Sequence, residues 1–158
     1  MHYKYFERNA DCANNPTNRP HVTPLEEIIE NFSFLDDWED RYGYLIELGN
    51  ALPSFPEADM TEANRVQGCV SQVWLTHRVD DGHIHFAAMS DAHIVRGLVA
   101  VALAIFSGRS AQDILSTSEE EVFSQIGLQE HITPQRANGL RALVARMKSA
   151  AQAELQTN

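Results

Sequence analysis

Apolar residues recur at helical spacing in the first third of the chain, beginning after Thr23. A threonine followed by proline, and three positions on by Glu26, is typical of a capped helix start. Two helices are expected here, with apolar stripes at Leu25, Ile28, Ile29 and Phe32 and at Trp38, Tyr42, Leu45 and Leu48. The second begins at Asp36 or Asp37 and ends at Gly49, and the prolines within residues 50–64 predict a loop.

In the middle of the chain apolar residues recur at every second position, which indicates β-strands. The alternating positions are Val73, Leu75, His77 and Val79, then Ile84, Phe86 and Ala88. The turn residues 80–82 lie between the two runs and predict a β-hairpin with a three-residue loop. Such a loop would place His77 opposite His85. A short strand at 65–67 is expected to add a third strand to the sheet.

Helices are predicted for the rest of the chain. The apolar run Ile94–Phe106 has 13 residues and contains Arg96, so it is too short for the about 20 residues of a membrane span and indicates a buried helix. Ser90 and Asp91 are expected to cap it, and the remaining helix starts are Ser110, Ser118 and Thr133. Two helices, a small antiparallel sheet of about three strands and several covering helices make an α+β fold.

Composition limits the classes of partner. Twelve basic and 22 acidic residues give a net charge of −10, which repels phosphate backbones and anionic lipid. We therefore expect neither nucleic-acid nor membrane binding. Two cysteines cannot form a disulfide framework and suit the reducing cytoplasm. Residues 1–22 lack an apolar export segment and are expected to be a flexible arm, whereas 23–155 form one domain.

Cys69 is the strongest candidate for chemistry. It follows Gly68, whose backbone freedom allows a loop to present the thiol just before the first strand. A thiol reacts as its thiolate, so polar neighbours would be needed to activate it. The local candidates are Gln67, Ser71 and Gln72. The alternative is a buried structural cysteine that acts as a small hydrophobe.

Two other chemistries are less well supported by the residues. A cysteine hydrolase needs a base, but His77 lies eight residues along the chain, roughly 26 Å if extended. The three histidines of the hairpin could bind a divalent ion, and they are His77, His83 and His85. However, the sequence has no CxxC pair, and Cys12 is too remote to complete a zinc site. One loop cysteine is too few for an iron–sulfur site, so no metal site is expected.

Four blocks of sequence resemble the SufE family of sulfur-acceptor proteins. They are WEDRYGYLIELGNALP at 38–53, RVQGCVSQVWL at 65–75, SDAHIVRGLVAV at 90–101 and HITPQRANGL at 131–140. The resemblance runs from about Thr23 to Ala150 and implies a fold shared with IscU-type scaffolds. Residues 1–22 lie outside it, and we expect them to be an upstream extension of the gene start.

The resemblance implies a sulfur carrier that stimulates its donor, an accessory protein rather than a stand-alone enzyme. Cys69 matches the cysteine that takes persulfide sulfur from a SufS- or CsdA-like cysteine desulfurase, for delivery to a SufBCD-like iron–sulfur scaffold. Pyridoxal phosphate would belong to the desulfurase, so no cofactor is expected on this chain. Asp91 and Arg136 match positions near the docking or loop region. The alternative function is an iron–sulfur or metal-binding scaffold.

Overall fold

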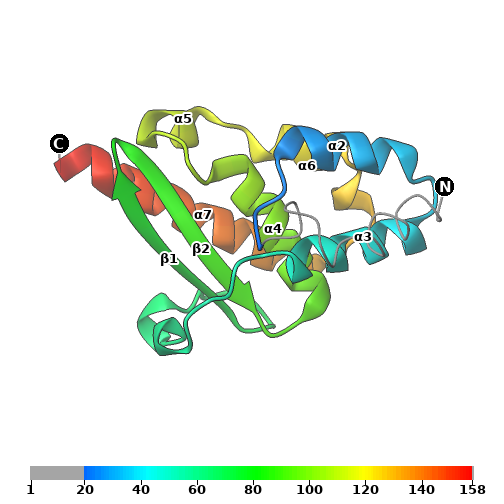
Figure 1. Cartoon of the computed structure of the whole chain (residues 1–158), viewed down its shortest axis with the longest axis horizontal. Coiled ribbons are helices and arrows are strands. Elements are labelled where there is room, and N and C mark those ends of the chain that lie inside the picture. The colour runs from blue at the N-terminus through cyan, green and yellow to red at the C-terminus, as the bar shows by residue number, and fades with distance from the viewer. Residues whose placement is uncertain (1–19, 158) are drawn as a thin grey trace.

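A computed structural model describes residues 20–157 as a two-stranded antiparallel sheet packed against a group of helices (Figure 1). The α+β prediction is confirmed. The elements in chain order are α2 (Leu25–Phe34), α3 (Trp38–Asn50), the 3-10 turns η3 (Glu57–Asp59) and η4 (Glu62–Asn64), β1 (Val73–Asp80), β2 (His83–Ser90), α4 (His93–Phe106), α5 (Ala111–Ser116), α6 (Glu119–Gln125), the 3-10 turn η5 (Leu128–Glu130) and α7 (Pro134–Thr157).

The hairpin has a two-residue turn, not the predicted three-residue loop. Asp80 pairs with His83, and the turn residues Asp81 and Gly82 have φ values of 51° and 77°. Asp-Gly is favoured in such a turn because both positions need positive φ. His77 consequently faces Phe86 and not His85. This register puts the apolar positions of both strands on one face, which the longer loop would have split.

The predicted third strand is reduced to a single bridge, so the sheet has two strands where about three were expected. Arg65 pairs with Trp74, and the Val66 amide donates to the Val73 carbonyl at 2.8 Å. The chain then turns away at Gly68, which has a φ of 92°. The loop that carries Cys69 therefore leaves the sheet edge immediately and cannot continue the ladder.

Side-chain caps form at some of the predicted helix starts only. Ser110 and Thr133 accept hydrogen bonds from backbone amides three residues on, as predicted. Asp37 caps α3 by accepting from the Glu39 amide at 2.9 Å. Thr23 and Ser118 make no such bond. Asp91 does not cap α4 either. The N-cap of α4 is Ala92, and the Asp91 carboxylate accepts a hydrogen bond from the Gln72 amide instead.

The core is built around α4, which crosses α3 on one side and lies under the sheet on the other (Figure 1). Nine of its 14 residues are buried, including Leu98 and Val99. Glycines let the two helices approach closely, because a Cβ on Gly97 would lie 2.2 Å from the Leu45 carbonyl oxygen. α7 packs against α5 and α4 and buries Leu143 and Met147. The apolar run predicted as a buried helix is therefore the centre of the core.

Most of the predicted N-terminal arm, residues 1–19, lies outside the part of the chain that the structure describes. From there onward, His21 joins the folded unit through its amide, which donates to the Ala51 carbonyl at 2.8 Å. Among residues 20–157, no helix has the length and apolar character needed to cross a membrane.

Candidate functional site

Cys69 lies on a loop that is tied down at both ends. On the upstream side the Arg146 guanidinium of α7 donates to the carbonyl oxygens of Arg65 and Ala63. On the downstream side the Gln72 amide donates to the Asp91 carboxylate at 3.1 Å, and the Asp91 amide donates to the Gln72 carbonyl at 3.3 Å. The residues between these anchors form a short connection, in which a glycine makes the bend. The anchors therefore hold the loop ends in place and leave the cysteine at the tip.

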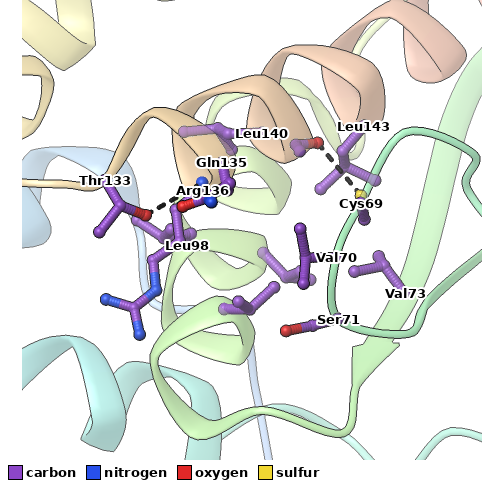
Figure 2. Close-up of a pocket in the computed structure, with 13 residues that line it drawn as sticks. Cys69, Val70, Ser71, Val73, Leu98, Thr133, Gln135, Arg136, Leu140 and Leu143 are labelled. Atoms are coloured by element: carbon purple, nitrogen blue, oxygen red, sulfur yellow. Dashed lines mark hydrogen bonds between the residues drawn. The ribbon is translucent and has the colours of Figure 1, made fainter.

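The Cys69 side chain points at α7 (Figure 2). Its thiol donates to the carbonyl oxygen of Gly139, with 3.4 Å between sulfur and oxygen. Gly139 has no Cβ, and one placed there would lie 3.3 Å from the cysteine sulfur. The side chain is therefore seated where α7 has a gap in its surface, and the gap exists because residue 139 is glycine.

The environment of the thiol favours its neutral form. Burial raises the pKa of Cys69 above its ordinary value, because the thiolate would lose solvation, and the nearby Arg65 guanidinium lowers it in part. The side chain is half-buried, so the thiol is neither sealed in the core nor freely exposed. A raised pKa lowers the fraction of thiolate, the reactive form, at neutral pH.

A cavity of about 320 Å³ opens beside the cysteine. Its walls are mainly apolar and come from α4 and α7, and they include Leu98, Leu140 and Leu143 (Figure 2). Val70, next to the cysteine, stands at the mouth with 80% of its surface exposed. Arg136 lines the end of the cavity away from the sulfur (Figure 2). The site thus combines one thiol, an apolar cavity and a cation at the rim.

The three polar neighbours considered as activating groups do not hydrogen-bond to the thiol in the described structure. Ser71 lines the cavity and is partly buried, whereas Gln67 and Gln72 are exposed. Gln72 acts through its backbone, which pairs with Asp91. Arg136 is exposed, and its amide donates to the Thr133 hydroxyl at 3.3 Å. The loop contact of Asp91 is thus visible, while both it and Arg136 remain predictions as partner-binding residues.

The hairpin histidines cannot converge on one ion, because neighbouring positions of a strand face opposite sides. His77 lies on the face of β1 that includes Leu75, and its partner is the buried Phe86. His83 and His85 point to the other face of β2. Over residues 20–157 no group of three or more histidine, cysteine or acidic side chains is placed to hold a metal.

Gly139 is the site residue that the sequence analysis missed. It lies 70 residues from Cys69, and it had been seen only as part of a family block. A signal was present, since an isolated glycine inside a long helix costs about 1 kcal/mol relative to alanine and usually has a packing reason. The identity of its packing partner could not be read from the sequence.

Comparison with known proteins identifies the family to which the chain belongs. A family model described as SufE, an Fe-S metabolism associated domain, matches residues 26–151. An uncharacterised SufE-like protein of Rhizobium meliloti is 54% identical over 85% of this chain and 99% of its own length. Another from Rhizobium etli is 52% identical over 82% of this chain and 90% of its own.

A solved structure supports the fold independently. The solution structure of a hypothetical protein from Thermus thermophilus superposes with a TM-score of 0.68 at 24% identity, covering 84% of this chain and 96% of that one. At that identity the likeness speaks for the fold alone. The match of the family model over most of the chain, together with the two close relatives, shows that this protein belongs to the SufE family.

Proposed function

We propose that this protein accepts sulfur as a persulfide on Cys69 from a cysteine desulfurase and carries it toward iron–sulfur cluster assembly. The family is associated with iron–sulfur metabolism. The observation that carries the finer proposal is the position of the Cys69 thiol. Cys69 stands at the tip of a loop anchored at both ends, against an apolar cavity, with its hydrogen bond to a backbone carbonyl and to no side-chain base.

Such a site suits transfer between sulfur atoms, which needs an accessible thiolate and a good leaving group but no catalytic triad. The Cys69 thiolate attacks the outer sulfur of a persulfide on the desulfurase. A new sulfur–sulfur bond forms at Cys69, the old bond breaks, and the cysteine of the desulfurase leaves as a thiolate. No external oxidant or reductant is required, because the transferred sulfur keeps its oxidation state.

The remaining roles belong to partners. The desulfurase, of SufS or CsdA type, would hold the pyridoxal phosphate that releases sulfur from L-cysteine, so this chain needs no cofactor for its own step. A SufBCD-like scaffold would take the sulfur afterwards. Val70 is exposed beside the thiol, and Arg136 is exposed at the far end of the cavity, so a docking partner could contact both.

The test is a transfer assay read by mass spectrometry. The full chain is mixed with desulfurase and L-cysteine, and we expect an adduct of about 32 Da, one sulfur atom, on the peptide that contains Cys69. Cys69→Ser should carry no adduct and should no longer stimulate the desulfurase, since a hydroxyl cannot accept the sulfur. Cys12→Ser is the matched control and should behave as the unmodified protein. An adduct absent from Cys69, or full stimulation by Cys69→Ser, contradicts the proposal.

A further inference from the structure

We propose that Gly139 is a positioning residue that distinguishes the empty carrier from the loaded one. Its carbonyl oxygen and missing side chain form a seat that holds the neutral Cys69 thiol, and the seat rejects the sulfur once it is ionised or bears a second sulfur atom. This inference rests on the proposed function, because it assigns a regulatory role to the same site.

The seat is specific in shape. The cysteine sulfur lies 3.4 Å from the Gly139 oxygen, and a Cβ at position 139 would stand 3.3 Å from that sulfur. That second distance is tighter than ordinary van der Waals contact, so a side chain at position 139 would require the sulfur to shift by a few tenths of an ångström. The bend at Gly68 is packed on the same helix, where a Cβ would lie 3.4 Å from Ala142. The loop therefore rests on one short stretch of α7.

The seat is also specific in chemistry, because a carbonyl oxygen accepts a hydrogen bond and cannot donate one. A neutral thiol supplies the hydrogen. A thiolate has none and would bring negative charge against the oxygen. In a persulfide the sulfur of Cys69 is bonded to carbon and to the second sulfur, so it carries no hydrogen whatever the pH. Loading therefore removes the only hydrogen bond that the side chain makes in the described structure.

Charged groups around the site do not restore that contact. Arg65 and the Arg146 guanidinium lie at the upstream end of the loop, and the Asp91 carboxylate lies at its downstream end. Arg136 lines the cavity from α7, whereas the residues that line it from α4 are apolar. An anionic sulfur is attracted to the guanidinium groups and repelled by the carbonyl oxygen. Ionisation and loading therefore each remove the hydrogen that the Gly139 oxygen accepts.

The first test needs no sulfur donor. At neutral pH, iodoacetamide should alkylate Cys69 about five-fold faster in Gly139→Ala than in the unmodified protein. This is the factor that corresponds to the loss of one ordinary hydrogen bond. Its rate-against-pH profile should move to lower pH, toward that of an ordinary thiol. Gly43→Ala is the matched control, because Gly43 is an exposed helical glycine with nothing within 4 Å of its added Cβ. Equal rates and equal profiles in the unmodified protein and both variants overturn the seat.

The second test compares the unmodified protein empty and loaded. Amide hydrogen exchange of residues 66–72 should be faster when Cys69 carries the persulfide, whereas α4 should exchange unchanged. Equal protection in both forms overturns the sensing role. If no adduct forms on Cys69, the proposed function fails, and the alkylation of Gly139→Ala still decides whether the seat exists.

Discussion

At the scale of single residues, the thiol of Cys69 is held in a form that protects it. Burial raises its pKa, and the Arg65 guanidinium offsets part of that effect. The hydrogen bond to Gly139 stabilises the same neutral form. A neutral, half-buried thiol resists oxidation, which begins at the exposed thiolate. This conformation therefore protects the thiol but lowers its reactivity, and in the proposed function docking of a donor would have to release the side chain.

The raised pKa gives a prediction about stability and pH. The native thiol keeps its proton to higher pH than the unfolded chain, whose cysteine titrates at about 8.5. Above that value the unfolded state has lost its proton while the native state still binds one, so the free energy of unfolding falls as pH rises. The contribution of the thiol is complete below the unfolded pKa and is lost as pH passes the native pKa.

Urea unfolding of the unmodified protein and Cys69→Ser between pH 7 and 10 measures this effect. The two proteins should differ by a constant amount up to about pH 8.5. Above it the stability of the unmodified protein should decline relative to Cys69→Ser, which lacks the titrating group. A difference that stays constant to pH 10 would show that the native thiol titrates like an ordinary one.

Sequence singled out Cys69 as the candidate for chemistry but did not reveal its contact with Gly139. Cys69 follows a glycine in a recognisable block, and this local signal suffices to single it out. Its partner at Gly139 is 70 residues away, and the Asp91 carboxylate that holds Gln72 is 19 residues away. Asp91 was expected to cap a helix because its neighbours in sequence suggested one. Its position beside the loop arises only when β2 returns along β1.

At the scale of elements, the crossing of α3 and α4 fixes the platform on which the site stands. Gly49 and Gly97 lie where the helices cross, and a Cβ on either would come within 2.8 Å of the backbone of the facing helix. Arg96, next to the second of them, donates to the Ser90 carbonyl from two guanidinium nitrogens and so joins α4 to the end of β2. The position of α4 therefore governs both the cavity wall and the end of the sheet.

Gly97→Ala should disrupt this crossing. The added Cβ would lie 2.2 Å from the Leu45 carbonyl oxygen, and neither backbone can yield without separating the helices. We expect a loss of about 3 kcal/mol or more in the free energy of unfolding, the upper range for overpacked cores. Gly43→Ala should instead gain up to about 1 kcal/mol through helix propensity. Denaturant titration checks both, and equal stabilities would contradict the close approach.

The elements themselves were largely predictable, because helical periodicity and turn residues act over a few positions. The hairpin illustrates the limit. Asp81 and Gly82 were correctly identified as turn residues, but the loop was expected to be one residue longer. That single residue changed the cross-strand partner of His77 from the predicted His85 to Phe86. The register is decided by the need to bury one face of both strands together, which is a tertiary effect.

At the scale of the whole molecule, the proposed function rests on the single free cysteine of the described residues and on the negative net charge of the chain. The net charge is −10, and the positive groups near the site include Arg65, Arg136 and Arg146. Cys69 is the free cysteine among the described residues, and Cys12 lies outside them. This inventory favours a carrier of sulfur over a holder of iron, because iron–sulfur clusters need several thiolate or imidazole ligands.

Anaerobic reconstitution with ferrous iron and sulfide distinguishes the two. The isolated protein should be colourless after desalting and should show no cluster absorption in the visible range. Cys69→Ser, treated alike, gives the background. A stoichiometric cluster that is present in the unmodified protein and absent from Cys69→Ser would instead establish the scaffold function.

Local patterns in the sequence were enough to predict the α+β class, the first two helices, the hairpin, the buried helix at Ile94–Phe106 and the identity of the candidate nucleophile. Each of these depends on periodicity, turn chemistry or a recognisable block of neighbouring residues. The surroundings of the sulfur, in contrast, emerged only from the folded chain. Folding placed Gly139 under Cys69, turned the expected third strand into a bridge and formed the cavity between α4 and α7. These contacts join distant parts of the chain, and they exist only because the helices and sheet bury their apolar faces together.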